Sequence, residues 1–481
     1  MGLTTEFLEK EQITQVETEN SEIFELKDCI GEGGQGAVFK TQRKNLLVKL
    51  SISRDNSLNK IKSIYRRYNN LRCRRDFPAY LAKPLCEIAP IERNDHIIYG
   101  YVMELMEDMV SINSLFRKNN ENPLEYINRM GGIQRMYTIL RKTAEILDKI
   151  HSLGYCYGDL NPNNVFVSSD TNYNEVQLID CDNLMIASEF EGMIYYPNYG
   201  APEVVKGLSS NNAITDTWSF AVLAFYTLRQ VFPFNGLLVT EANSLNLSQM
   251  EAKAKFAELP FIDDEQGDNN PPSTAYPIDT METSELKELF KQTFEKKQSP
   301  MERPALFEWI EALQHGENSF VICASCGAHY LRHKANKQCP FCDNTSLKAC
   351  VVIQAYVQHG NYVELCGKQT IITQNNSAII EIPFKEYQML KVEMSFNNTD
   401  HKIIVKQLTS EEIPTKWVIE RITAKAKTAI LPPEMPIRFS AQDGIDNYLI
   451  FPSYTFKIDN NEEELHKATG IIRFKYRGAN G

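Results

Sequence analysis

The segment GEGGQGAVF, residues 31–39, constrains the fold more than any other part of the chain. It places Gly31, Gly33 and Gly36 in GxGxxG spacing, between stretches that are rich in strand-forming residues. In a dinucleotide-binding fold this spacing opens a helix, but here AVFKT follows and leads into another strand-like run, LLVKL. Two strands joined by a glycine turn can lay backbone N–H groups over a phosphate chain. The segment therefore predicts a β-rich lobe that binds a nucleotide.

Two side chains and a hinge complete the nucleotide site predicted for this lobe. Val38 follows the glycine turn, and Lys49 ends the third strand, where its ammonium group can reach the α and β phosphates of ATP. The alternative for Lys49 is an exposed lysine at a sheet edge. The run YVMELME, residues 101–107, predicts a strand that breaks into a hinge, and the backbone from Glu104 to Met106 can hydrogen-bond adenine. The alternative for this run is the end of a buried strand.

The segment GYCYGDLNPNNVFV, residues 154–167, places Asp159 five residues before Asn164, between a helical pattern and a strand-like run. An aspartate can orient a hydroxyl group and an asparagine can hold a cation, and phosphoryl transfer requires both tasks. The same residue types also occur in Asx turns that end a helix. Taken alone, the segment allows both interpretations.

Apolar residues at helical spacing predict that most of the chain between residues 56 and 313 is helical. Helices are expected from about residue 56, at 133–150 with Gly154 as a stop, and at 215–228, and the pattern resumes at 286–313. The first of these carries its apolar stripe at Leu58, Ile61, Tyr65 and Tyr68.

Composition and charge limit the function classes. The 481 residues include 62 acidic and 51 basic side chains, a formal charge of −11, which argues against coating nucleic acid or an anionic membrane. The first twenty residues lack a basic leader with an apolar core, and no run approaches the roughly 18 apolar residues of a membrane span. Eleven cysteines, four of them in paired spacing, suit a reducing compartment. We therefore expect a cytoplasmic protein.

Several motifs occur in the order in which protein kinases carry them. From about residue 24 to residue 313 the chain resembles a protein kinase domain, which implies a bilobal fold. The resemblance is carried by the glycine segment, Lys49, Asp159 with Asn164, Asp180 after EVQLID, Ala201-Pro202-Glu203, Asp216-Thr217-Trp218-Ser219, and Arg303-Pro304.

The resemblance implies a role for each of these residues. Asp159 would orient the acceptor hydroxyl and take its proton, while Asn164 and Asp180 would hold Mg²⁺ against the phosphates of ATP. Glu203 and Arg303 resemble the family's buried ion pair, which braces the larger lobe. Asp216 resembles the helix residue that supports the catalytic loop through hydrogen bonds to its backbone.

The chain departs from the kinase pattern on the first helix. No glutamate occurs between residues 33 and 86, so the usual acidic partner of Lys49 is missing, and Tyr68, Asn69 and Asn70 stand at about its place. Either another carboxylate pairs with Lys49, or the lysine is paired only when ATP binds.

A second departure precedes the catalytic aspartate, because Tyr157 and Gly158 replace the first two residues of the family's His-Arg-Asp triplet. Without that arginine, a phosphate on the segment from Asp180 to Glu203 has lost its usual clamp. We therefore expect activity that does not depend on phosphorylation of this segment. Its available hydroxyls are Ser188, Tyr195, Tyr196 and Tyr199.

Two further departures lie beside the reacting groups. Asn161 replaces a lysine that many Ser/Thr kinases place two residues after the catalytic aspartate, which removes one cation from the γ-phosphate. In Asp180-Cys181-Asp182 the second aspartate replaces a flexible glycine. Asp180 is the expected metal ligand because it directly follows a strand, with Asp182 as a second ligand or an alternative one.

Two short segments indicate a particular subgroup of the protein kinase family. A third segment is strongly basic. GDLNPNN and ELPFIDDEQGDNNPP resemble a bacterial kinase subgroup often associated with a PP2C-type phosphatase and a von Willebrand A-type partner in stress or tellurite-resistance clusters. The segment NKIKSIYRRYNNLRCRR could grip RNA or an acidic protein, and the alternative is a solvated helix face with Leu58, Ile61 and Tyr65 turned inward.

Four cysteines form a separate motif after the kinase-like part. Cys323, Cys326, Cys339 and Cys342 give two CxxC pairs twelve residues apart, which predicts a structural tetrahedral Zn²⁺ site. The alternatives are scattered free thiols, an iron site, or ligation by His329 or His333. Cys350 and Cys366 are expected to be ordinary thiols.

We therefore expect an α+β multidomain protein: an extension (1–21), a bilobal protein kinase-like domain (22–314), a zinc ribbon (319–348) and an all-β sandwich-like module (349–481), for which alternating runs such as HKIIVKQL argue. The expected function is ATP- and Mg²⁺-dependent phosphorylation of Ser or Thr in a protein, with autophosphorylation included. The alternatives are a pseudokinase scaffold, in which the tail binds partners, and a small-molecule phosphotransferase. A nucleic-acid or membrane partner is not expected.

Overall fold

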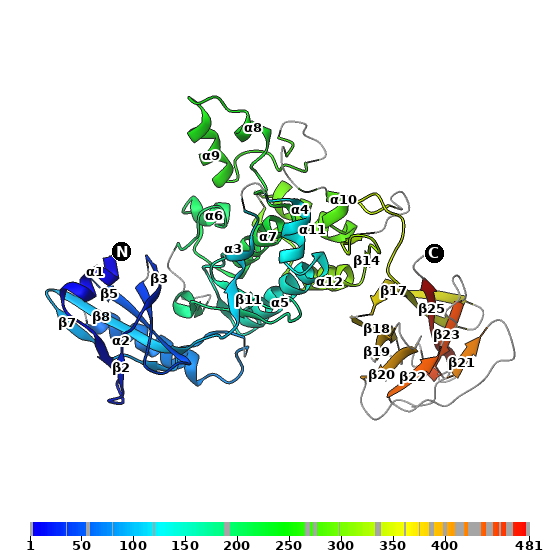
Figure 1. The fold of residues 1–481 in the computed structure, drawn as a ribbon, viewed down its shortest axis with the longest axis horizontal. Coiled ribbons are helices and arrows are strands. Elements are labelled where there is room, and N and C mark those ends of the chain that lie inside the picture. The colour runs from blue at the N-terminus through cyan, green and yellow to red at the C-terminus, as the bar shows by residue number, and fades with distance from the viewer. Residues whose placement is uncertain are drawn as a thin grey trace. The chain divides into compact units, whose positions relative to one another are not determined.

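The computed structural model divides the chain into two compact units (Figure 1). Met1–Asn119, Ile139–Ala275 and Lys287–Ile310 form the first, and Asn120–Thr138, Tyr276–Leu286 and Glu311–Gly481 form the second. The structure describes residues 3–34, 36–53, 58–78, 80–118, 121–186, 193–264, 270–272, 276, 278–297, 299–331, 338–359, 362–374, 376–383, 389–397, 402–408, 418–421, 434–438, 446–451, 454–457 and 465–477.

The first unit opens with an antiparallel sheet in the order β3-β4-β5-β8-β6, with β7 paired to β8. Alternating apolar residues of β4, β5 and β8, among them Phe39, Leu50 and Val102, form its buried core. The strands are β3 (Cys29–Gly33), β4 (Gly36–Lys40), β5 (Leu46–Ser53), β6 (Cys86–Glu87), β7 (Ile91–Arg93) and β8 (His96–Glu104), and α1 (Leu3–Lys10) with the hairpin β1 (Gln15–Glu17) and β2 (Ile23–Glu25) precedes them. These elements confirm the strands predicted around the glycine segment.

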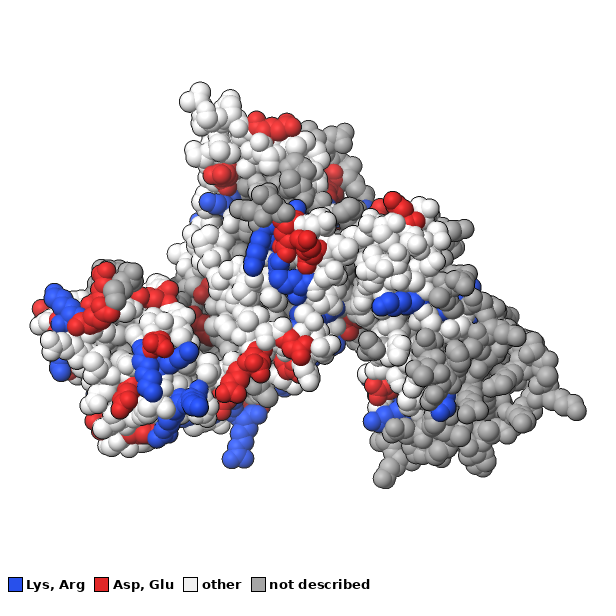
Figure 2. Space-filling view, in the orientation of Figure 1, with Lys and Arg blue, Asp and Glu red and all other residues white. Residues whose placement is uncertain are grey.

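Helix α2 (Leu58–Cys73) packs on this sheet through Ile61, Tyr65 and Tyr68, which contact residues of β8. The predicted helix is therefore confirmed, but Leu58, expected on the inward face, is 40% exposed because it lies at the first position of the helix. Buried tyrosines are not available to stack on nucleic-acid bases. Because the apolar residues of α2 are turned to the sheet, the solvated-face interpretation of this helix fits better than the nucleic-acid one. Over the whole face shown in Figure 2, acidic and basic side chains are interspersed.

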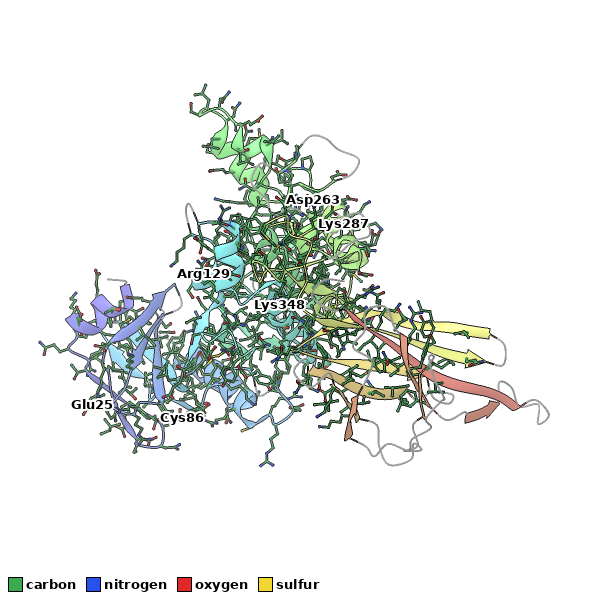
Figure 3. The ribbon with its side chains drawn as sticks, turned by 45° about the vertical axis from the view of Figure 1, so that its right-hand side comes forward. Glu25, Cys86, Arg129, Asp263, Lys287 and Lys348 are labelled. Carbon is green, nitrogen blue, oxygen red and sulfur yellow. The ribbon has the colours of Figure 1, made fainter. Side chains whose placement is uncertain are left out.

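The helical part of the first unit packs around α7 (Ala213–Arg229), which is buried along most of its length. Asn212 begins α7 with a capping box that involves Thr215, so the local sequence sets where the helix starts. Aromatic rings surround it, as in the edge contact of Phe225 with Phe290, 5.0 Å between ring centroids. Arg229, at its end, donates two hydrogen bonds to Asp263, which is labelled in Figure 3.

Short strands and helices complete the helical part. The strands form one sheet in the order β12-β11-β9 and one pair, β10-β13. The elements are β9 (Met109–Ser111), α3 (Ile112–Leu115), α5 (Ile133–Ser152), β10 (Tyr155–Cys156), β11 (Val165–Ser168), β12 (Val176–Leu178), η1 (Cys181–Asn183), β13 (Met185–Ile186), α6 (Pro202–Val205), α8 (Leu237–Thr240), α9 (Leu247–Lys255), α11 (Ser284–Glu295), η3 (Pro300–Glu302) and α12 (Leu306–Glu317). Of these helices, α5, α11 and α12 each have residues in both units.

The predicted helices at 133–150 and 215–228 are confirmed as α5 and α7, and Gly154, with φ +81°, follows the end of α5. The pattern at 286–313 corresponds to two helices, α11 and α12, because the short 3₁₀ turn η3, with Pro300 in its first turn, separates them. Among the residues that the structure describes, no helix combines the length and the apolar character needed to cross a bilayer.

The second unit contains α4 (Pro123–Arg129), α10 (Ile278–Met281), a two-stranded ribbon and two larger antiparallel sheets. Apolar residues of both sheets, such as Ile353, Val392 and Phe474, belong to one buried cluster. The ribbon is β14 (Phe320–Ile322) with β15 (His329–Leu331), and the sheets are built from β16 (Cys350–His359), β17 (Tyr362–Thr373), β18 (Ser377–Pro383), β19 (Met389–Asn397), β20 (Lys402–Gln407), β21 (Val418–Arg421), β22 (Glu434–Arg438), β23 (Asp446–Ile450), β24 (Tyr454–Lys457) and β25 (Leu465–Arg477).

Candidate active site

The loop between β10 and β11 carries Asp159, and two asparagine side chains of the same loop hold it. The Asn161 amide donates to the Asp159 carbonyl oxygen at 3.0 Å and to its Oδ1 at 3.2 Å. The Asn164 amide donates to the same carbonyl at 2.9 Å and approaches Oδ2 at 3.4 Å. Both asparagines are buried. The segment therefore surrounds one carboxylate with buried amides, and it also contains an Asx turn, because Asn161 Oδ1 accepts from the Asn163 N–H at 3.0 Å.

The Asp159 carboxyl is partly buried next to another acid. Burial and the negative charge of Asp180 raise its pKa to about 6, while hydrogen bonds from Asn161 and Asn164 act in the opposite direction. A carboxylate with such a pKa is ionised at neutral pH and is a better proton acceptor than an exposed aspartate. The position can therefore hold a general base.

Asp180 follows β12 and lies near the first lobe's lysine. Its backbone is left-handed, with φ +61° and ψ +58°, a conformation that costs energy for a residue with a side chain and is concentrated at functional sites. The Lys49 ammonium group donates to Asp180 Oδ1, and both side chains are largely buried, 8% and 19% exposed. A carboxylate outside the first helix thus pairs with Lys49, which is the first of the two alternatives left open by the sequence.

The oxygens of Asp180 and Asn164 fit a Mg²⁺ site. Because the NH₂ group of Asn164 donates its hydrogen bond to Asp159, the Asn164 Oδ1 is the atom that can coordinate a cation. Carboxylate and amide oxygens are the ligands that Mg²⁺ prefers, usually together with water and phosphate oxygens. The backbone of Asp182 lies in η1, but its side chain lies outside the described residues.

Asp216, in the first turn of α7, binds the backbone of the loop that carries Asp159. Its Oδ2 accepts from the Tyr157 N–H at 2.7 Å and its Oδ1 from the Gly158 N–H at 2.9 Å. His151 Nε2 lies 2.9 Å from the same Oδ2. A carboxylate that is 2% exposed and accepts two backbone hydrogen bonds fixes the residues directly before Asp159.

Two residues that the sequence did not single out as site residues also position the loop. The Tyr157 hydroxyl donates to the carbonyl oxygen of Ile179, which directly precedes Asp180, so it joins the Asp159 loop to the segment that carries Asp180. Asn211 donates to the Gly158 carbonyl at 3.0 Å and exchanges hydrogen bonds with the backbone of Ile194. Tyr157 was expected only as a replacement for histidine, and no local pattern marks Asn211.

The segment from Asp180 to Glu203 differs from the expectation at one hydroxyl. Tyr195 and Tyr196 are exposed, but Tyr199 is 3% exposed and burial raises its pKa, so the prediction that its hydroxyl is available is wrong. It packs edge-on against Phe232, 5.7 Å between centroids. Ser188 lies outside the described residues.

The glycine hairpin pairs Gly33 with Gly36 across β3 and β4. A Cβ atom on Gly36 (φ +137°) would lie 2.1 Å from the Leu50 carbonyl oxygen, so the backbone requires glycine there. A Cβ on Gly31 or Gly33 would meet nothing within 4 Å, so these positions leave open space over the hairpin.

The other predicted nucleotide contacts lie on the same sheet. Val38 is directly opposite Lys49 in the pairing of β4 with β5. Glu104 ends β8, and the next N–H, of Leu105, donates to the Asn45 carbonyl at 2.8 Å. Met106 follows immediately and is half-buried.

Glu203 and Arg303 form a bidentate ion pair within the first unit. Arg303 Nη1 and Nη2 donate to the two carboxylate oxygens at 2.6 and 2.8 Å, and the side chains are 1% and 13% exposed for Arg303 and Glu203. The guanidinium also lies over the ring of Trp218, 4.8 Å from its centroid. The pair therefore ties α6 to α7 and to the segment after η3.

A second candidate site lies in the second unit. The ligand atoms of Cys323, Cys326, Cys339 and Cys342 all lie within 4.8 Å of one another, with two sulfur pairs at 3.6 Å. Sulfurs on a tetrahedral Zn²⁺ are about 3.8 Å apart, because each Zn–S bond is about 2.3 Å. Burial raises the pKa of the Cys323 thiol, but hydrogen bonds from the N–H groups of Cys326 and Ser325 outweigh it and lower that pKa to about 7. Burial raises the pKa of Cys326 and raises that of Cys339 to about 12, so the support for a metal site is the spacing of the four sulfurs. These thiols fit Zn²⁺.

Neither predicted histidine alternative adds to this cluster among the described residues. His329, in β15, is not one of its members, and burial lowers the pKa of its imidazole. His333 lies outside the described residues. The buried core around the cysteines includes Ile371 of β17, with Leu124 of α4 packed against it, so the ribbon shares its apolar contacts with neighbouring elements.

Comparison with known proteins identifies the family of the part of the chain that carries Asp159 and Asp180. The family model described as protein kinase domain matches residues 24–316, more than half of the chain. The serine/threonine-protein kinase dkf-2 of Caenorhabditis briggsae is 24% identical over 234 residues, which are 46% of this chain and 18% of that protein. A probable serine/threonine-protein kinase of Clostridium perfringens is 25% identical over 221 residues, which are 44% of this chain and 30% of that protein. The chain thus spans less than a third of the length of these relatives.

Among solved structures, the ROP18 kinase domain in complex with AMP-PNP and sucrose matches with a TM-score of 0.42 and 15% identity. The match covers 63% of this chain and 82% of that one.

Proposed function

The chain belongs to the protein kinase domain family, and on that basis we propose that it is an ATP- and Mg²⁺-dependent kinase that phosphorylates Ser or Thr in proteins, itself included. The observation that carries the proposal is the joint placement of Lys49, Asp180, Asp159 and Asn164. Lys49 is ion-paired with Asp180, and the Asp159 carboxyl is close enough to both for their charges to shift its pKa. Asn164 joins them through its hydrogen bond to Asp159.

In this proposal the reaction is a single displacement at the γ-phosphorus. The substrate hydroxyl oxygen forms a bond to that phosphorus as its proton passes to Asp159, and the bond to the β–γ bridging oxygen breaks, with its electron pair leaving on ADP. Asn161 and Asn164 hold the Asp159 carboxylate in place, and Asp216 fixes the backbone before it. Lys49 supplies a cation for the α and β phosphates. Bound at Asn164 and Asp180, Mg²⁺ would neutralise charge on the β and γ phosphates.

The pKa of Asp159 sets the expected pH dependence. Because the base must be ionised, kcat/KM should fall about tenfold for each pH unit below about 6 and level off above it. Removing the Asn161 amide takes away a hydrogen bond that favours the ionised form. The acidic limb should therefore move to higher pH in Asn161→Ala.

The measurement is the pH profile of peptide phosphorylation for the unaltered chain, Asn161→Ala and the control Asn163→Ala. The Asn163 side chain contacts Asn113 instead of Asp159. A profile that is unchanged in Asn161→Ala would contradict the positioning role given to Asn161.

One observation favours a second candidate function, a pseudokinase scaffold. Helix α2 carries no acidic residue, and the carboxylate paired with Lys49 is the one expected to bind metal. In that case MgATP would bind with no transfer. Incubation with γ-labelled ATP and a generic protein substrate separates the two: label on protein supports the kinase, and tight ATP binding without label supports the scaffold.

We also propose that the four-cysteine cluster is a structural zinc site within a ribbon at 319–348. About one zinc ion per chain should remain after gentle purification, because four thiolates leave no ligand position open. Cys326→Ser should lose most of it, whereas Cys366→Ser, a thiol of β17 away from the cluster, should retain it. Elemental analysis of the three proteins checks this, and equal zinc in both variants would contradict the assignment.

The remaining parts of the proposal concern domains and partners. We propose the boundaries 1–21, 22–314, 319–348 and 349–481, with the last segment a β-sandwich-like module that binds a partner protein. The shared buried cluster of its two sheets supports this. The segments GDLNPNN and ELPFIDDEQGDNNPP suggest a PP2C-type phosphatase and a von Willebrand A-type protein as partners. The kinase subgroup that these segments resemble suggests a bacterial origin, and the cysteine content suggests the cytoplasm.

A further inference from the structure

The carboxylate of Glu32 joins the tip of the glycine hairpin to helix α1. Glu32 stands between Gly31 and Gly33 in β3. Its Oε1 accepts from the N–H groups of Thr4 at 2.8 Å and Thr5 at 3.0 Å, and its Oε2 accepts from the Thr5 hydroxyl at 2.5 Å. Three hydrogen bonds therefore connect segments that are 27 and 28 residues apart.

These contacts complete the first turn of α1. The first N–H groups of a helix have no partner inside it, and a side chain normally caps the second and third of them. Thr4 and Thr5 are the second and third residues of α1, which begins at Leu3. A carboxylate also suits the positive end of the helix dipole. Glu32, in the glycine hairpin, thus accepts the hydrogen bonds that a capping residue next to the helix would otherwise accept.

Helix α1 is itself fixed on the sheet (Figure 1). Leu8 is 3% exposed and belongs to the same buried cluster as residues of β4 and β5. Phe7 packs against His96, 4.9 Å between ring centroids, and Asn94 donates to Glu11 at 2.8 Å. Helix α1 is therefore fixed on the sheet, and a side chain bound to its first turn, such as that of Glu32, is fixed with it.

The hairpin tip has little packing of its own. A Cβ on Gly31, Gly33 or Gly34 would meet nothing within 4 Å, in contrast to Gly36, which lies against Leu50. A glycine-rich tip has many accessible backbone conformations, so a tether at its one acidic side chain restricts which of them are populated.

We propose that the contact of Glu32 with Thr4 and Thr5 sets the position of the glycine hairpin over the nucleotide, which makes Glu32 a positioning residue for ATP binding. The inference depends on the proposed function for the identity of the ligand. Helix α1, which was expected only as part of an extension, would then help to position the glycine hairpin of the active site. Loss of the tether should raise the KM for ATP and leave kcat nearly unchanged, because the hairpin would be held less well before and during transfer alike.

The test compares the full chain with Glu32→Gln, Thr5→Val and the control Glu25→Gln. Glu25 is an exposed acid of β2 and takes part in none of the hydrogen bonds that join Glu32 to Thr4 and Thr5. Glu32→Gln should raise the KM for ATP and the amide exchange of residues 30–38 about fivefold, the size expected for one charged cap, with kcat within about twofold. Thr5→Val should have a smaller effect in the same direction, and Glu25→Gln none.

Hydrogen exchange separates this inference from the proposed function. If the unaltered chain does not bind ATP but hairpin exchange rises in Glu32→Gln, the tether stands and the kinase proposal fails. If exchange rises only in α1 while the hairpin and the KM for ATP are unchanged, Glu32 is a helix cap alone and the inference is wrong.

Discussion

Replacing Asp159 by asparagine should lower kcat for phosphate transfer about 10²- to 10⁴-fold, while the affinity for MgATP stays within a few fold. Asparagine keeps the shape of the side chain but cannot accept the proton of the attacking hydroxyl. Binding should persist because Lys49 and Asp180 are unaltered. The measurement is steady-state transfer of γ-labelled phosphate to a protein substrate, beside calorimetric titration with MgATP.

Asn163→Ala in the same loop is the matched control for this experiment. It should retain near-normal transfer, since its side chain bonds to Asn113 and not to the carboxylate. Transfer that is undiminished in Asp159→Asn would show that another group takes the proton, and the assignment of the base would be wrong.

Breaking the buried ion pair of Glu203 with Arg303 should cause a large loss of stability. Glu203→Ala leaves a guanidinium that is 1% exposed without its counter-charge, which costs about 3–5 kcal/mol in comparable buried pairs. The double variant Glu203→Ala, Arg303→Met should lose much less than the sum of the two single changes, because no buried charge remains alone.

Urea unfolding followed by tryptophan fluorescence measures this effect, since Arg303 lies over Trp218. Glu302→Gln is the control: its pair with Lys296 is more than half exposed, 55% and 56%, and should contribute far less. Equal shifts of the midpoint in Glu203→Ala and Glu302→Gln would contradict a bracing role for the buried pair.

The parts of the site that could be predicted from sequence are those set by neighbouring residues. The GxGxxG spacing, the five-residue separation of Asp159 from Asn164 and the two CxxC pairs each determine local geometry. Apolar periodicity identified α5 and α7 for the same reason. The exposure of Leu58 could not be predicted in this way, because apolar periodicity does not indicate which apolar residue lies at the end of a helix.

Contacts between distant segments could be predicted only where the family resemblance implied them, as it did for Glu203 with Arg303 and for Asp216 with the backbone before Asp159. Lys49 and Asp180 are 131 residues apart, and a missing glutamate in α2 does not indicate which carboxylate takes its place. The Tyr157 hydroxyl, which reaches Ile179, and the Asn211 amide act through the folded backbone and leave no local pattern. The hydrogen bonds that join Glu32 to α1 could not be predicted either. From the sequence alone, an acidic residue within a glycine-rich segment is expected to be an exposed loop residue.

The proposed kinase requires that Lys49, Asp180, Asp159 and Asn164 all act on one nucleotide. Calorimetric titration of ATP, with and without Mg²⁺, into the unaltered chain, Lys49→Ala and Asp180→Asn tests it most directly. We expect one nucleotide bound per chain, tighter with Mg²⁺, with the affinity reduced at least tenfold by Lys49→Ala and the Mg²⁺ enhancement abolished by Asp180→Asn. Binding that is equal in all three proteins, or absent from the unaltered chain, would contradict it.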